Sequence, residues 1–343
     1  MYKFLIRPIL FKIDPEKVHH LIVHSLNLAF KIPGIKLIFE LLFKYEHSKL
    51  EREFLGLKFK NPIGLAAGFD KDAKIYKEFS SFGFSFIEIG TVTPKPQAGN
   101  DKPRIFRVPQ DKALINRMGF NNLGVDQAVE RLKNRDKSII IGGNIGKNTA
   151  TPNEQAIEDY DYCFRKLYDY VDYFVINVSC PNVTDLGKLQ DRDSLGAIMQ
   201  RLIDIRSSQS TRKPILLKIS PDLNPKQVDD AVEISIEKGI DGFVVSNTTI
   251  TRNNLTITQQ TIDAIGRGGM SGSPIASKST ELIRYIAEKT ENKMPIIGVG
   301  GIMSEKDALD KIKAGATLIQ IYTGFIYEGP AFVKRIKKAL VKN

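Results

Sequence analysis

From about residue 60 onwards, short apolar runs alternate with longer segments of helical periodicity. Each run is rich in Ile, Val, Leu or Phe and closes on glycine or a polar residue. The eight runs are 62–68, 85–92, 138–146, 173–180, 214–220, 242–247, 295–301 and 317–324. Buried strands that alternate with helices are typical of a parallel sheet. Eight such units in about 280 residues predict an α/β fold of the (β/α)8 TIM-barrel type rather than an open sheet.

The carboxyl ends of these predicted strands supply the candidate site. In barrels of this type, the loops at the carboxyl ends of the strands carry the functional residues. Any single Gly or Asn there could serve only to form a turn, but nearly every run closes in this way. The candidates are Ala67, Gly68, Lys71, Thr91, Asn144, Asn177, Cys180, Lys218, Ser246, Asn247, Thr248, Gly300, Gly301, Tyr322 and Thr323.

The first 48 residues follow a different pattern. Apolar residues have helical spacing in 14–30 and again in 34–45, and Pro33-Gly34 between them is typical of a turn between helices. We therefore expect a small N-terminal helical hairpin over 1–48 and a catalytic barrel over 49–343. The hairpin could pack against the barrel, or lie in a membrane interface with its lysines at the headgroups, and the two interpretations are compatible.

The net charge of +11 is concentrated at the two ends of the chain. Residues 1–50 hold eight Lys/Arg and four Asp/Glu, and residues 331–343 hold five Lys/Arg and no acidic residue. The segment between them is nearly neutral. A nucleic-acid enzyme would be expected to carry its basic surface around its working face. We therefore expect no nucleic-acid partner, and a flavin-dependent reductase acting on RNA is kept only as an alternative that the total charge suggests.

The distribution of His and Cys limits the chemistry. All four histidines precede residue 50, which excludes a Ser-His-Asp or Cys-His nucleophile and a histidine-ligated zinc site in the barrel. We expect no metal. Cys163 and Cys180 are too few for a disulfide framework, which favours a reducing compartment. The N-terminus is a poor match to a secretory signal, and no stretch is long and apolar enough to span a membrane.

Two short motifs indicate a phosphate-binding site, of a kind that many barrels share, and a thiol near it. Gly-Gly at 300–301 and Tyr-Thr-Gly at 322–324 close the last two predicted strands, where barrels commonly bind phosphate, and FMN fits better there than ATP or NAD. The string VINVSCPN (175–182) ends a strand in a loop that presents Cys180. A free cysteine is usually a small buried hydrophobe, which we expect of Cys163. At Cys180 the polar neighbours favour a proton-transfer role, with Lys71 and Lys218 as nearby cations.

Several motifs in order over about residues 60–330 resemble the dihydroorotate dehydrogenases of pyrimidine biosynthesis. They are AAGFDKD, EIGTVTPKPQAGN, PRIFRVPQDKALINRMGFNN, GGNIGKN, INVSCPN, LLKISPD, SNTT, GGMSGSP, GVGGI and QIYTGF. INRMGFNN and the NxSxPN loop are not general features of barrels. The hairpin sequence LFKIDPEKVHHL is similar to the membrane-associated, quinone-using class of that family.

The resemblance implies roles for individual residues. It implies that FMN is held by Ala67, Gly68, Lys71, Thr91, Asn144, Asn177, Lys218, Ser246, Gly272, Gly300, Gly301, Tyr322 and Thr323. It implies that dihydroorotate contacts Lys71, Asn116, Arg117, Met118, Gly119, Phe120, Asn177, Asn182, Asn247 and Thr248. Cys180 would be the base, and His19, Arg107 and Tyr322 would lie at the quinone site. The location implied is the cytoplasmic side of the inner membrane, as a peripheral protein.

One departure keeps alternatives open. The quinone class usually carries Ser at the base position, whereas Cys is typical of the soluble class. A soluble-type enzyme that uses fumarate or NAD, with the hairpin serving oligomerisation, is therefore an alternative. A non-catalytic membrane-surface protein built on a barrel is another. The hairpin and the RIFRVPQ motif favour the quinone class.

Overall fold

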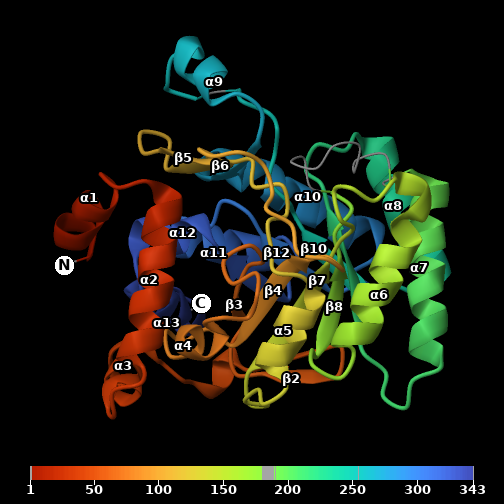
Figure 1. Ribbon diagram of the computed structural model, residues 1–343, viewed down its shortest axis with the longest axis horizontal. Coiled ribbons are helices and arrows are strands. Elements are labelled where there is room, and N and C mark those ends of the chain that lie inside the picture. The colour runs from red at the N-terminus through yellow and green to blue at the C-terminus, as the bar shows by residue number, and fades with distance from the viewer. Residues whose placement is uncertain (1, 180–188, 190, 254, 343) are drawn as a thin grey trace.

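A closed barrel of eight parallel strands forms the centre of the protein (Figure 1). The computed structural model describes residues 2–179, 189, 191–253 and 255–342. The strands follow one another around the barrel in chain order. They are β3 (Ile63–Leu65), β4 (Phe86–Val92), β7 (Ile140–Ile145), β8 (Tyr173–Ile176), β9 (Ile215–Ile219), β10 (Gly242–Val245), β12 (Ile296–Val299) and β13 (Leu318–Ile321). Each lies within one of the eight predicted runs, so the barrel prediction is confirmed.

Helices follow the strands and cover the outside of the barrel. They are α4 (Tyr76–Ser80), α5 (Val125–Leu132), α6 (Ala156–Leu167), α7 (Arg192–Ser207), α8 (Pro225–Lys238), α10 (Ala276–Lys289), α11 (Glu305–Lys313), α12 (Thr323–Glu328) and α13 (Ala331–Lys342). Local sequence sets their ends. In α8, Asn224 and Gln227 form a reciprocal capping box, and the helix ends at Gly239 with φ +74°.

Large side chains fill the barrel and close the end at which its strands begin. Strands β1 (Arg52–Phe54) and β2 (Leu57–Phe59) form an antiparallel hairpin there. Phe59 packs edge-to-face on Phe86 of β4, with ring centroids 5.2 Å apart. Tyr173 and Leu216 lie in the same buried cluster. In the described part of the chain, these buried side chains fill this end of the barrel, which leaves the opposite end for a ligand.

A second, antiparallel sheet covers the opposite end of the barrel, as the position of β5 and β6 in Figure 1 shows. Its strands are β5 (Ile105–Val108), β6 (Ala113–Asn116) and β11 (Gly269–Gly272), with β6 in the middle. The short helix α9 (Gln259–Ile265) precedes β11. The sequence did not predict this sheet, because β6 and β11 pair across about 150 residues.

The N-terminal segment is helical, as predicted. A π-helical turn (Tyr2–Ile6) and α1 (Arg7–Leu10) lead to α2 (Pro15–Ala29) and α3 (Ile35–Phe43), which lie along one side of the barrel (Figure 1). One face packs on the barrel, where Phe39 contacts Phe82 with centroids 5.2 Å apart. The other face leaves Leu37 and Leu41 60% and 72% exposed. Within the described residues, no helix is both long enough and apolar enough to cross a membrane.

Candidate active site

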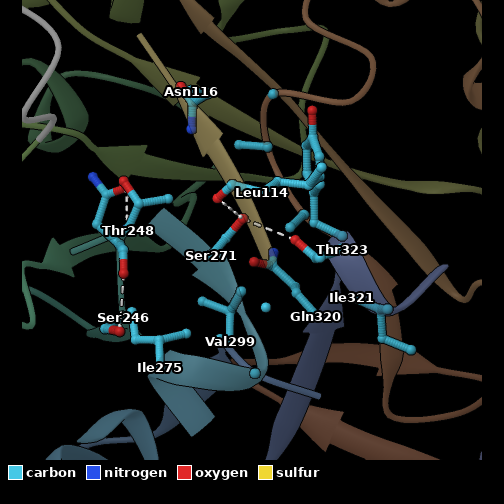
Figure 2. A pocket seen from close by; sticks show the side chains of 18 of the residues that line it. Leu114, Asn116, Ser246, Thr248, Ser271, Ile275, Val299, Gln320, Ile321 and Thr323 are labelled. Carbon is cyan, nitrogen blue, oxygen red and sulfur yellow. Dashed lines mark hydrogen bonds between the residues drawn. The ribbon is translucent and has the colours of Figure 1, made fainter. Parts of the chain in front are cut away.

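A pocket opens at the carboxyl ends of the barrel strands, under the covering sheet. It gathers most of the predicted site residues from segments far apart in the chain. The predicted residues that line it are Ala67, Gly68, Lys71, Thr91, Asn116, Met118, Gly119, Phe120, Asn177, Lys218, Ser246, Asn247, Thr248, Gly272, Gly300, Gly301, Tyr322 and Thr323. Figure 2 shows Ser246 and Thr248 on one side of the pocket and Thr323 on the other.

Some predicted residues lie elsewhere. The Arg117 guanidinium donates to the carbonyls of Pro103 and Ile265 and stacks over Phe106, so its side chain faces away from the pocket. The structure therefore does not place Arg117 in the pocket wall. Asn144 lies beneath the pocket rather than in its lining, and His19 and Arg107 lie where the N-terminal helices contact the barrel. Cys180 and Asn182 are outside the described residues.

A buried hydrogen-bond network supports the pocket floor. The Glu88 carboxylate, fully buried in β4, accepts from Asn144 Nδ2 at 2.8 Å and from Gln320 Nε2 at 2.6 Å. Thr91 Oγ1 donates to Asn144 Oδ1 at 2.6 Å and accepts from Asn177 Nδ2 at 2.8 Å. Sequence reasoning missed Glu88 and Gln320. The sequence does carry a signal for both, since Glu88 lies inside the apolar run FIEIG and Gln320 inside LIQIY. A polar side chain buried in such a run needs a hydrogen-bond partner.

Lys218 brings a buried positive charge to the same floor. Its side chain is 8% exposed, and its Nζ lies 3.6 Å from Glu88 Oε1. That distance is long for a hydrogen bond. In the described part of the chain the ammonium donates no hydrogen bond, while both Glu88 oxygens accept one from an amide. The Lys218 ammonium can therefore donate to an acceptor bound in the pocket.

Glycine residues that follow β12 and β13 expose their backbone to the pocket. Gly300 and Gly301 follow β12 with φ +115° and +72°. A Cβ at Gly301 would meet the Ala276 backbone at 2.2 Å, and a Cβ at Gly324 would meet the Ile302 carbonyl at 2.0 Å. Ser271 and Thr323 join their hydroxyls at 2.8 Å across the pocket edge (Figure 2). Glycine and small hydroxyl residues at this place give an anion access to main-chain N–H groups.

The loop after β3 carries Lys71 to the pocket. Asp70 is buried and accepts from the backbone N–H groups of Lys74 at 2.6 Å and Ile75 at 2.9 Å. Burial raises the pKa of Asp70 to about 6, although these hydrogen bonds oppose the rise. Lys71 Nζ donates to Asn121 Oδ1 at the pocket edge. A hydrogen-bonded turn thus presents an ammonium group to an anionic ligand.

A line of aromatic rings leads from the pocket to the N-terminal helices. Tyr322 in the pocket packs on Phe69 with centroids 5.2 Å apart, and Phe69 packs on His19 of α2 at 5.4 Å. Burial lowers the pKa of His19 to about 4, helped by neighbouring His20 and Lys71, so its imidazole is neutral at pH 7. Arg107 of β5 donates to the carbonyl of Ile13 at 2.6 Å and stacks over Phe11. These residues connect the pocket with the helical hairpin.

Comparison with known proteins assigns the chain to a family. A family model described as Dihydroorotate dehydrogenase matches residues 49–343. A protein of Christiangramia forsetii named dihydroorotate dehydrogenase (quinone) is 54% identical over 343 residues, covering 100% of this chain and 99% of its own. A Shewanella loihica protein of the same name is 44% identical, with 99% and 98% covered.

Solved structures agree with this assignment. A structure described as ligand-free DHODH from Eimeria tenella is 34% identical and superposes with a TM-score of 0.86, over 96% of this chain and 94% of that one. Its complex with ferulenol gives a TM-score of 0.84 over 96% and 91%. The match spans both the hairpin and the barrel. The chain belongs to the dihydroorotate dehydrogenase family, among relatives whose names specify a quinone.

Proposed function

We propose that this protein oxidises (S)-dihydroorotate to orotate in pyrimidine biosynthesis, with FMN as cofactor and a membrane quinone as electron acceptor. The observation that carries the proposal is one pocket in which a buried ammonium, several amide side chains and a glycine-rich edge converge. That combination suits an anionic cofactor next to a flat polar substrate. The names of the relatives support the same reaction.

The residues in the pocket fit FMN at both of its ends. The bare backbone at Gly300, Gly301 and Gly324 suits the phosphate. The Lys218 ammonium, with no hydrogen bond to the described residues, suits the polar edge of the flavin ring. Bound FMN would accept two electrons from the substrate and pass them to the quinone.

The cation and the amide side chains of the pocket suit dihydroorotate. This substrate is a carboxylate with two carbonyls and two ring N–H groups, so it needs a cation and amides that both donate and accept. Lys71 would bind the carboxylate. Asn177 and Asn247 are already oriented, since Asn247 Nδ2 donates to Asn177 Oδ1 at 3.3 Å and to Ser179 Oγ at 2.9 Å. Thr248 and Asn116 complete the wall.

Cys180 is the proposed base. It follows Asn177 and Ser179, whose side chains hydrogen-bond at the pocket. Its thiolate would take the proton from C5 of dihydroorotate while the hydride leaves C6 for the flavin, so that a C5–C6 double bond forms and orotate results. Asn177 and Asn247 would hold the ring during this step, and Lys71 would keep the carboxylate in place.

The hairpin is the proposed contact with the membrane. Its outer face exposes large apolar side chains on successive elements, among them Phe4 at 83% and Leu41 at 72%. Lys31 and Lys36 flank this face in sequence. An apolar face bordered by cations suits the surface of an anionic bilayer. We place the protein as a peripheral protein on the cytoplasmic side of the inner membrane, with quinone entering between hairpin and barrel near His19, Arg107 and Tyr322.

Anaerobic titration with dihydroorotate tests the proposed reaction. The purified protein should be yellow, and about one equivalent of dihydroorotate should bleach its flavin absorbance. Reoxidation by a ubiquinone or menaquinone analogue should then be much faster than by fumarate or NAD. Rapid turnover with fumarate and none with a quinone would contradict the quinone assignment. Protein without flavin would favour the non-catalytic alternative, and steeply salt-dependent RNA binding would favour the RNA-reductase alternative.

Removal of the hairpin tests its role. Deleting residues 1–45 should lower quinone-dependent turnover at least about tenfold more than flavin reduction at saturating dihydroorotate. The reason is that His19 and the apolar outer face are lost, whereas the pocket lining lies after residue 65. Both rates are measured on one preparation, the second by stopped-flow absorbance. Equal loss of both would mean that the hairpin serves only to stabilise the barrel.

A further inference from the structure

A buried ion pair joins the hairpin to the loop before β5. Glu16 of α2 and Arg104 are 5% and 7% exposed. Arg104 Nε donates to Glu16 Oε2 at 3.1 Å, and Nη2 donates to Oε1 at 2.8 Å, in the bidentate geometry that fixes both partners. Burial favours a raised pKa for Glu16, but hydrogen bonds and charge from Arg104 and Lys102 outweigh it and lower the pKa to about 2. Glu16 is therefore ionised at neutral pH.

The same guanidinium also organises its own loop. Arg104 Nη1 donates to the carbonyl of Ala98 at 2.6 Å and to that of Asn100 at 2.8 Å. The Glu16 carboxylate thus holds one side of the guanidinium while two loop carbonyls hold another. A lysine could not make this set of contacts, because it lacks the planar array of donors.

The loop in turn holds the pocket wall. The Asn100 N–H donates to the Met118 carbonyl at 3.1 Å, and Asn100 Nδ2 donates to the Arg117 carbonyl at 2.9 Å. Gln97 Nε2 donates to the carbonyls of Gly119 and Phe120, both at 3.1 Å. Met118, Gly119 and Phe120 line the pocket. An unbroken series of hydrogen bonds therefore runs from helix α2 to residues 118–120.

We propose that Glu16 and Arg104 are positioning residues for the dihydroorotate side of the pocket, so that docking of the hairpin on the barrel sets the affinity for substrate. The inference rests on the proposed function and extends the role of the hairpin beyond access for quinone. A second hydrogen bond between the hairpin and the barrel involves no residue of the pocket. Lys334 of α13 donates to the Leu42 carbonyl at the end of α3 at 2.8 Å. Lys334 thus offers a control at a second contact between the hairpin and the barrel.

The test separates substrate affinity from turnover and stability. Glu16→Gln and Arg104→Lys should each raise the KM for dihydroorotate about tenfold and change kcat less than about twofold. The assay uses the full-length flavoprotein and a water-soluble dye as acceptor, so that the quinone step does not enter. Orotate binding, followed by the flavin spectrum, should weaken by the same factor. Glu16→Asp, which keeps the charge, should recover part of the loss.

The control shows whether a higher KM comes from misplaced pocket residues or from lower stability of the whole protein. Lys334→Met should leave the KM for dihydroorotate unchanged, and it should lower the melting temperature less than Glu16→Gln, because it removes a single exposed hydrogen bond rather than a buried ion pair. A lower melting temperature with unchanged KM in both Glu16→Gln and Arg104→Lys would overturn the inference, and so would an equal rise of KM in Lys334→Met. If either variant fails to fold, the other and Glu16→Asp carry the test. Wild-type protein without dihydroorotate-dependent turnover would instead refute the proposed function, and the inference with it.

Discussion

Replacing Cys180 with alanine is expected to slow flavin reduction by dihydroorotate about 10²- to 10⁴-fold while the flavin stays bound. Loss of a positioned general base costs rates of this order. The barrel has no histidine that could take over the proton, because all four histidines precede residue 50. The rate is measured by anaerobic stopped-flow absorbance, and the flavin content of the variant is determined on the same sample.

Cys163 provides the matched control for this substitution. Cys163 lies on α6, is fully buried, and has a thiol pKa that burial raises well above its usual value. It behaves as the small buried hydrophobe that the sequence analysis predicted. Cys163→Ala should leave the reduction rate within about twofold, because burial disfavours the thiolate of Cys163 and the residue does not line the pocket. Near-normal reduction by Cys180→Ala would reject Cys180 as the base.

Replacing Lys218 with methionine should have the second large effect, a loss of flavin binding or at least about a 10²-fold slower flavin reduction. The substitution removes a cation 3.6 Å from the buried Glu88 carboxylate and removes the donor proposed for the flavin ring. A carboxylate left without its counter-charge in the barrel interior also destabilises the folded state, by about 3–5 kcal/mol in comparable buried pairs. The measurements are FMN stoichiometry, the rate of reduction and the melting temperature.

Lys213 is the control on the same segment of chain. It precedes β9, and its ammonium donates to the Val171 carbonyl. Burial lowers the pKa of Lys213. Lys213→Met therefore also removes a partly buried lysine, but at the amino end of the strand, away from the pocket. It should leave FMN stoichiometry and the reduction rate unchanged. Equal loss of flavin in both variants would show that the Lys218 effect comes from general destabilisation.

Alternation along an extended segment explains why the Arg117 side chain differs from those on either side of it. The string INRMGFNN was assigned to the substrate as a continuous block, from Asn116 to Phe120. Successive residues of an extended chain point to opposite faces. Asn116 and Met118 line the pocket, whereas Arg117 between them points outward to Pro103 and Ile265. The motif lies along the pocket wall, and the fold shows which of its side chains face the pocket.

The sequence by itself determined the barrel, the helical hairpin and the pocket residues at the carboxyl ends of the barrel strands, because these depend on local patterns. A buried parallel strand is an apolar run that ends in glycine or a polar residue, and the carboxyl ends of such strands must meet in a closed barrel. Asp14 and Pro15 mark the start of α2 in the same local way, since the Asp14 side chain caps the helix.

Only the tertiary structure decided the partners of the buried charges and the covering sheet. Glu88 and Gln320 are hydrogen-bonded although they are 232 residues apart in sequence, and Glu16 and Arg104 are 88 residues apart. Strands β6 and β11 pair although about 150 residues separate them. The physical reason is that a charge can be buried only where other segments bring donors to it, and such partners are fixed by packing rather than by neighbours in the chain.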